Sequence, residues 1–117
     1  MFEFNDIHNI VYGLPIQTSD LNKSTATNAV YHLLLHYDDK THRFKIATSR
    51  IYRELSDSFD TSVKAVESRL NRFQRDFNKT MSKELEEAIA DKCIVSIEDM
   101  SNGQFLKVLA DYVMSKF

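Results

Sequence analysis

The sequence predicts an all-α fold, a compact bundle of about six helices that contains a helix-turn-helix. Turn-forming residues are rare, because the chain of 117 residues has two glycines and one proline, and an all-β fold needs many more. Hydrophobic residues make up 43% and charged residues 27% of the chain, a balance typical of globular domains rather than disordered segments. The length fits a single domain over residues 1–117.

Residues 1–26 are expected to form one N-terminal helix followed by a polar connection. Hydrophobic residues around Ile7 to Tyr12 predict a short helix, and Gly13-Leu14-Pro15 favours a turn after it. The polar stretch from Gln17 to Thr25 is typical of a connection between helices. The next helix is then predicted from Ala26 to Tyr37, where hydrophobic residues lie three and four positions apart.

Two helices separated by a short break predict the helix-turn-helix over residues 48–77. The first covers about residues 47–58, and the break Phe59–Ser62 offers hydroxyl and carboxylate groups for an N-cap. The second, about Ser62–Phe77, is amphipathic, with a polar and partly basic side suited to a DNA major groove. An ordinary amphipathic bundle helix has the same periodicity, so both interpretations stay open. The hydrophobic stripe of the predicted second helix consists of Val63, Val66, Leu70, Phe73 and Phe77.

Three further elements complete the chain. A helix is predicted from about Ser82 to Lys92, and Cys93–Ile97 is a short β-like run that fits a buried loop equally well. The C-terminal helix is predicted over residues 103–116, with Ser101 or Asn102 as its N-cap.

Positive charge is concentrated in the middle of the chain. Residues 40–79 hold ten basic and five acidic groups, whereas the whole chain has a net charge of −2. A cationic middle between anionic flanks indicates a local surface for an anionic partner, for which phosphate backbones are the commonest candidate.

The sequence indicates neither an enzyme nor a metal or cofactor site. It has no glycine-rich phosphate loop, nucleophile elbow or CxxC motif. His32 and His36 have the spacing of two ligands on one helix face, but no third ligand is obvious. Cys93 is interpreted as a small buried residue, and the carboxylates from Glu84 to Asp91 as a solvated face. Without an apolar run of membrane-spanning length or a signal peptide, we expect a cytoplasmic protein with no membrane or small-molecule partner.

The segment Thr48–Phe73 resembles the C-terminal DNA-binding effector domain of the response regulator that initiates sporulation in endospore-forming bacteria. The family's spacing is kept without a gap by Thr48, Ile51-Tyr52, Leu55, Phe59, Asp60-Thr61-Ser62, Val66-Glu67 and Leu70. Ile7–Ile10 before Gly13-Leu14-Pro15, Asn102–Phe105 and Ala110-Asp111 extend the similarity over residues 7–117. The chain has no room for the family's receiver domain, so the resemblance implies a stand-alone relative.

The resemblance implies that the helix of about Ser62–Phe77 enters the major groove. In the family, the glutamate matching Glu67 and arginines one and four residues after it read bases, but here Ser68 and Asn71 stand at those two positions. Because the two arginines are absent, sequence preference is expected to differ from the family's or to be lost. We expect the bases to be read by Glu67, Ser68 and Asn71. The residues expected to contact phosphates or position the helix are Thr61, Ser62, Lys64, Arg72 and Arg75.

The leading hypothesis is a sequence-specific transcriptional regulator that binds double-stranded DNA. Family behaviour implies weak homodimerisation on tandem sites. The alternative is a protein-interaction module that keeps the fold and antagonises or partners a related regulator without reading DNA. The missing arginines and the isoelectric point of about 6.1 motivate this alternative, since DNA-binding modules are usually strongly basic.

Overall fold

The computed structural model describes residues 3–80, 83 and 100–117 of the chain. This part forms a compact, mostly helical fold, as predicted, and none of its helices is long and apolar enough to cross a membrane. Apart from Lys83, the predicted helix Ser82–Lys92 lies outside the described residues, and so does the run Cys93–Ile97. In chain order the elements are α1 (Phe4–Gly13), α2 (Asp20–Leu35), β1 (Tyr37–Asp38), β2 (Arg43–Phe44), α3 (Thr48–Ser58), α4 (Val63–Thr80) and α6 (Asn102–Met114).

Helix α2 begins six residues earlier than the sequence predicted, at Asp20 instead of Ala26. The prediction of a polar connection from Gln17 to Thr25 is therefore wrong for its last six residues, which belong to α2. Ser19 caps the helix, because its side chain accepts a hydrogen bond from the N–H of Asn22 at 3.1 Å. Inside the helix, the Thr25 hydroxyl donates to a carbonyl oxygen one turn back at 2.7 Å. Polar residues with such internal partners fit a buried helix, so their polarity did not mark a loop.

A short β-hairpin, not predicted from the sequence, follows α2. Strands β1 and β2 pair antiparallel, with Tyr37 opposite Phe44 and Asp38 opposite Arg43. The aromatic rings of Tyr37 and Phe44 lie 5.2 Å apart, centroid to centroid. The predicted helix to Tyr37 therefore ends two residues early, at Leu35. Each strand has only two residues, too few for an alternating hydrophobic pattern to be visible in the sequence.

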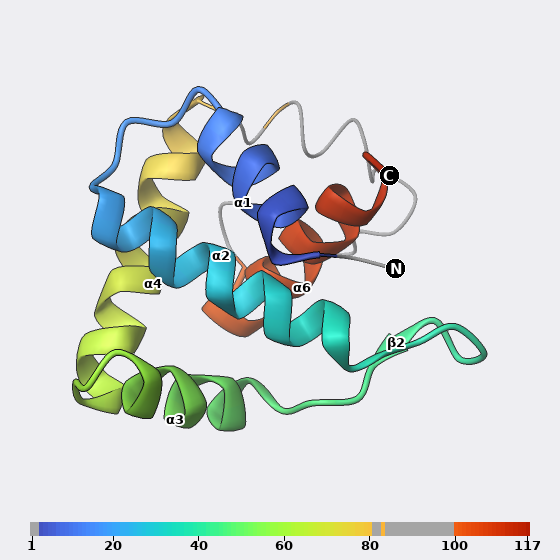
Figure 1. The fold of residues 1–117 in the computed structure, drawn as a ribbon. Helices are drawn as coiled ribbons and strands as arrows, with labels where there is room; N and C mark the ends of the chain where they lie inside the picture. Colours follow the sequence, from blue (N-terminus) through green and yellow to red (C-terminus); the bar gives the residue numbers. More distant parts are fainter. Residues whose placement is uncertain (1–2, 81–82, 84–99) are drawn as a thin grey trace.

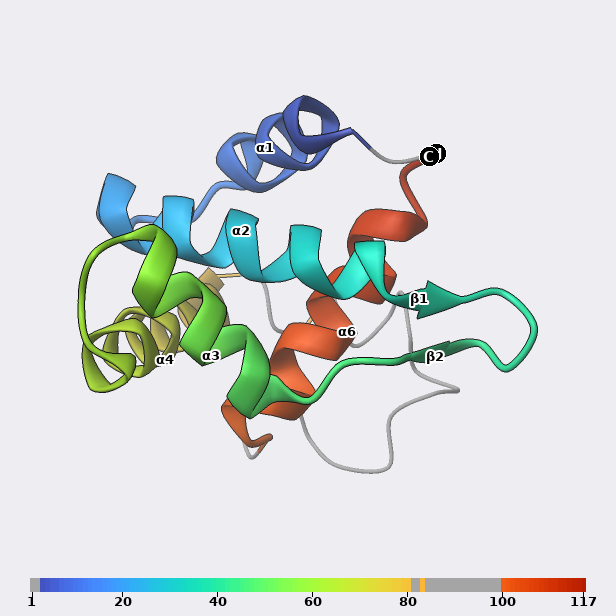
Figure 2. The same cartoon turned by 60° about the horizontal axis from the view of Figure 1, so that its bottom comes forward.

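Helix α2 occupies the middle of the molecule. Figure 2 shows α1 on one side of it and α3, α4 and α6 on the other, and α2 contacts all four of these helices. Behind α2, the side chains of Phe73 and Phe77 from α4 meet Phe105 from α6, and all three are fully buried. The Phe77 and Phe105 rings pack edge to face with centroids 5.1 Å apart. These aromatic contacts fix α4 against α6.

The start of α6 is tied closely to α3. Ser101 caps α6 as predicted, in a capping box with Gln104. A Cβ atom added to Gly103 would lie 2.8 Å from the Thr48 hydroxyl oxygen, so a larger residue would push the two helix starts apart. Glycine at this position therefore lets the N-terminal ends of α3 and α6 lie side by side.

Candidate nucleic-acid interface

Four residues, Phe59–Ser62, join α3 to α4. Asp60 has a φ angle of 50°, in the left-handed region that aspartate tolerates better than most residues. The N–H of Thr61 then donates to the carbonyl oxygen of Ser56 in α3 at 2.9 Å. The chain thus turns back on α3, which runs across the N-terminal end of α4 in Figure 1.

Ser62 begins α4. Its hydroxyl oxygen accepts from the N–H of Ala65 at 3.0 Å, and its carbonyl oxygen accepts from the N–H of Val66 at 3.1 Å. Ser62 is exposed, whereas Thr61 is half-buried. These bonds give Ser62 a clear role in positioning the helix.

The buried side of α4 matches the predicted stripe at four of its five positions. Val66, Leu70, Phe73 and Phe77 are completely buried. Val63 is the exception, with 39% of its surface exposed, because it is the first residue of the helix and extends past the core. The helix therefore packs as an amphipathic helix whose polar side faces outward.

The predicted DNA-contacting residues of α4 lie on its outer side. The side chains of Lys64 and Arg72 form no ion pair or hydrogen bond with any residue that the structure describes. The Arg75 Nε atom lies 3.8 Å from a carboxylate oxygen of Asp76, a long contact that is weak because the arginine side chain is exposed to solvent. Ser68 is half-buried. The exposed residues of the predicted set on this helix are Lys64, Glu67, Asn71, Arg72 and Arg75.

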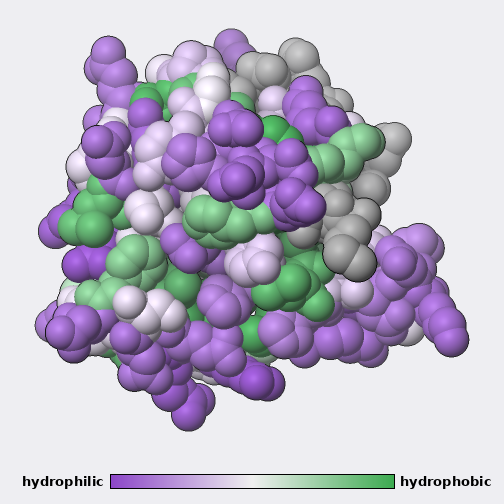
Figure 3. Space-filling model, viewed as in Figure 1, coloured by the Kyte–Doolittle hydropathy of each residue, from purple (hydrophilic) through white to green (hydrophobic). Residues whose placement is uncertain are grey.

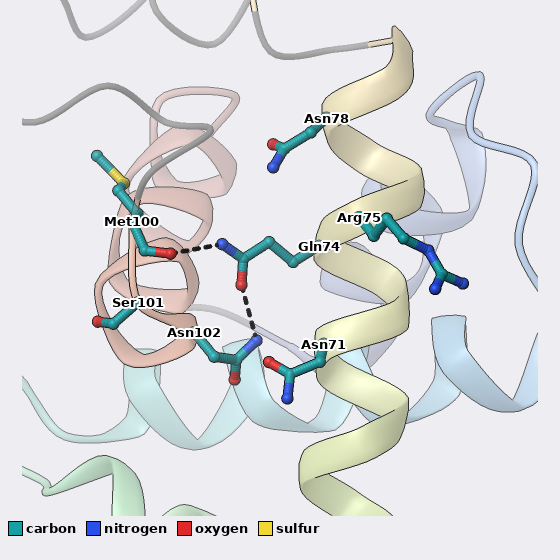
Figure 4. A pocket seen from close by; sticks show the side chains of 7 residues that line it. All are labelled: Asn71, Gln74, Arg75, Asn78, Met100, Ser101 and Asn102. Carbon is teal, nitrogen blue, oxygen red and sulfur yellow. Dashed lines mark hydrogen bonds between the residues drawn. The ribbon is translucent and has the colours of Figure 1, made fainter.

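A polar hollow of about 500 Å³ separates part of α4 from the start of α6. In Figure 4, Asn71, Gln74 and Asn78 project from α4 toward α6, whereas the Arg75 guanidinium points to the other side of the helix. Asn71 and Arg75 thus leave α4 in different directions, which suits two different kinds of contact. The hollow is lined by Asn71, Gln74, Arg75, Asn78, Met100, Ser101 and Asn102.

A chain of side-chain hydrogen bonds that was not predicted from the sequence connects α3, α6 and α4. The Tyr52 hydroxyl donates to Oδ1 of Asn102 at 2.5 Å, and Nδ2 of Asn102 donates to Oε1 of Gln74 at 3.1 Å. Nε2 of Gln74 then donates to the carbonyl oxygen of Met100 at 2.9 Å (Figure 4). These bonds hold the outer side of α4 at a fixed distance from α3 and α6. The only sequence signal was a glutamine, Gln74, beside the hydrophobic stripe.

Glu67 lies close enough to Tyr52 to influence its ionisation. Burial raises the pKa of Tyr52 to about 12, and the negative charge of Glu67 contributes a smaller increase. Tyr52 therefore remains a neutral hydrogen-bond donor at physiological pH. The same proximity places Glu67 beside α3, at the edge of the outer side of α4.

The Tyr52→Phe variant is expected to lose one tyrosine ionisation, with a midpoint near pH 12. The chain has five tyrosines, so the difference between the wild-type and variant phenolate titrations should show one group with a midpoint near pH 12. Because the folded pKa is raised, the stability that the neutral hydroxyl contributes is fully present below pH 10.0 and is lost toward pH 12. Near-ultraviolet absorbance against pH measures this, with Tyr37→Phe as the control. A difference midpoint near pH 10.0 would contradict the described environment of Tyr52.

Arg69, at the margin of the outer side, turns inward instead. Its guanidinium carbon lies 5.8 Å from the centroid of the Phe59 ring, and its Nη1 atom is buried without a hydrogen-bond partner among the described residues. Arg69 thus packs on the turn between the two helices.

The histidine pair has other partners in the structure. Nδ1 of His32 lies 3.2 Å from a carboxylate oxygen of Glu54, and Nδ1 of His36 donates to the carbonyl oxygen of His32 at 2.9 Å. No group of three or more possible metal ligands occurs in residues 3–80, 83 and 100–117. Cys93 and the carboxylates from Glu84 to Asp91 lie outside these ranges.

Comparisons of the chain with protein-family models, curated proteins and solved structures find no match. The resemblance to the sporulation effector domain therefore stays a prediction.

Proposed function

We propose that the protein is a DNA-binding transcriptional regulator in which α3 and α4 act as a helix-turn-helix and α4 enters the major groove. One observation carries this proposal. The outer side of α4 presents polar and cationic side chains on a helix whose direction is fixed by the turn bonds and the Tyr52–Asn102–Gln74 hydrogen bonds. A rigid helix of this kind fits the width of a B-DNA major groove.

Each outer residue has a chemistry that suits its proposed role. A carboxylate such as Glu67 accepts from the amino group of cytosine, and an amide such as Asn71 pairs with adenine through two hydrogen bonds. The Ser68 hydroxyl can donate a hydrogen bond to a base or accept one from it, so it suits either cytosine or adenine. Lys64, Arg72 and Arg75 supply the positive charges that neutralise phosphates, with Thr61 and Ser62 positioning the start of the helix. The exposure of Lys64 and Arg72 without partners in the described structure leaves both charges available.

The test is selection of genomic fragments by the purified protein, followed by sequencing and by fluorescence anisotropy on the enriched fragment. With six to ten phosphate contacts, affinity is expected to fall by roughly 10³ to 10⁵ between about 50 and 200 mM salt. Two tandem copies of the motif would support the weak homodimerisation that the resemblance implies. If no motif is enriched and binding shows no salt dependence, the proposal fails and the protein-interaction module becomes the better interpretation.

Replacing Asn71 by alanine is expected to change the sequence preference. The variant loses the amide that pairs with adenine, so one position of the enriched motif should become degenerate, at a cost of about 1–3 kcal/mol of discrimination. The matched control is Asn9→Ala, because Asn9 is exposed on α1, across α2 from α4 (Figure 2). If selection returns the same motif with the Asn71 variant, Asn71 does not read a base.

A further inference from the structure

A second cationic surface begins at the hairpin and continues onto α3. Between residues 40 and 53 the chain carries five basic side chains and no aspartate or glutamate. We call these side chains the basic strip: Lys40, Arg43, Lys45, Arg50 and Arg53. All five residues are exposed. None of them was among the residues predicted to contact DNA.

The hairpin that carries the first part of the basic strip is held by its own hydrogen bonds. The Asp38 carboxylate accepts from the N–H of Lys40 at 3.0 Å and from the Thr41 hydroxyl at 2.9 Å. These bonds lower the pKa of Asp38, the Lys40 N–H having the largest effect. At the base of the hairpin, the N–H of Lys45 donates to the carbonyl oxygen of His36 at 2.7 Å. The hairpin is therefore an ordered projection.

Most of the positive charge on the basic strip is not neutralised within the described structure. Lys40, Arg43 and Arg53 form no ion pair with any described residue. The Lys45 ammonium lies 3.8 Å from Asp38, and Nε of Arg50 lies 3.1 Å from a carboxylate oxygen of Glu54. In both pairs the cation is exposed and the carboxylate is half-buried, so solvent screens and weakens the attraction. The strip thus keeps at least three available cations.

The position of the hairpin relates the basic strip to the proposed DNA site. Figure 2 shows the hairpin extending away from the helices at the C-terminal end of α2, with a short connection that leads from β2 to the start of α3. Its projecting surface in Figure 3 is hydrophilic. In a helix-turn-helix, the first helix crosses the DNA backbone while the second lies in the groove. An element attached to the start of the first helix therefore lies beside the flanking duplex.

We propose that the basic strip contacts the phosphate backbone of the duplex beside the groove that α4 occupies. This inference rests on the proposed function and extends its footprint. Its cations come from two elements, three from the hairpin segment and two from α3, so they are spread along the chain instead of surrounding one small anion. A row of separated cations suits the repeating phosphates of a duplex. The contacts carry no base specificity, so they add affinity without changing the motif.

The test compares wild type with the Lys40→Ala/Arg43→Ala variant. Both side chains are exposed and without partners in the described structure, and the backbone bond from Lys40 to Asp38 remains, so the variant should fold normally by circular dichroism. The matched control is Lys23→Ala/Lys116→Ala, which removes the same charge. Lys23 lies in the first turns of α2, at the end opposite the hairpin, and Lys116 is near the C-terminus.

Binding is measured by anisotropy on a random-sequence duplex pool of about 24 base pairs, and by hydroxyl-radical footprinting on the most enriched fragment. Loss of two phosphate contacts should reduce the slope of log affinity against log salt by about 1.8 and weaken binding roughly 10- to 100-fold at about 0.1 M salt. The footprint should shorten on one flank only, while the selected motif stays the same. The control variant should match wild type in slope and footprint.

Two results would overturn the inference in distinguishable ways. In the first, wild type binds DNA, and the Lys40→Ala/Arg43→Ala variant keeps the wild-type salt slope and footprint. The basic strip then makes no contact with the DNA phosphate backbone, and the proposed function stands. If wild type itself shows no salt-dependent DNA binding, both the inference and the proposed function fail.

Discussion

Replacing Arg72 and Arg75 together by alanine is expected to weaken DNA binding roughly 10- to 100-fold at about 0.1 M salt, on every duplex sequence. Both side chains are exposed on the outer side of α4. Arg72 forms no ion pair with a described residue, and Arg75 has only the 3.8 Å contact with Asp76. Removing them deletes two proposed phosphate contacts, so the slope of log affinity against log salt should fall by about 1.8.

Anisotropy titrations at several salt concentrations measure this change on the enriched fragment and on an unrelated duplex. The Lys23→Ala/Lys116→Ala variant is again the charge-matched control, because it changes net charge equally without touching α4. The enriched motif should not change, since phosphate contacts carry no base information. An unchanged salt slope would remove both arginines from the set of phosphate-contacting residues.

Replacing Phe77 by alanine is expected to lower the free energy of unfolding by about 3–5 kcal/mol. The side chain is fully buried, with its ring 5.1 Å from Phe105 and 6.2 Å from Phe73, centroid to centroid. The substitution leaves a cavity between α4 and α6, where the surrounding helices relax only partly. Because the free energy of unfolding of small domains is only about 5–15 kcal/mol, the substitution removes a large fraction of the protein's stability.

Urea denaturation followed by circular dichroism measures the free energy of unfolding for this variant. Leu35→Ala serves as the control, because Leu35 is 56% exposed at the end of α2 and surface substitutions usually change stability by less than about 0.5 kcal/mol. A loss below about 1 kcal/mol in Phe77→Ala would show that α4 does not pack on α6 as described.

The helices that carry the proposed site were the best predicted from the sequence. Hydrophobic residues three and four apart set the buried side of α4, and charged residues opposite them had to face outward. Local chemistry also limited the cap of α6 to Ser101 or Asn102, and the structure shows Ser101, which forms a capping box with Gln104. Patterns of this kind need only neighbours along the chain, which is why they can be read without a structure.

The features that were not predicted depend on contacts between distant residues or on satisfied polar groups. Tyr52 and Asn102 are 50 residues apart in sequence, and no local pattern shows that they meet. Thr25 is polar yet buried, because its hydroxyl bonds to the backbone of its own helix. The hairpin is stabilised by the Asp38 side chain, a few backbone bonds and one pair of aromatic rings, Tyr37 and Phe44. These contacts leave no hydrophobic periodicity in the sequence.

The most direct measurement of where DNA binds is a nuclear magnetic resonance titration of the isotope-labelled protein with the enriched duplex. We expect salt-sensitive chemical-shift changes for the backbone amide resonances from Ser62 to Arg75, at the start of α4 and along it. Similar changes are expected in the hairpin and at the start of α3. The amides of α1, on the far side of α2 (Figure 2), should stay unchanged. Shifts concentrated on α1, with α4 unaffected, would show that α4 is not the helix that binds DNA.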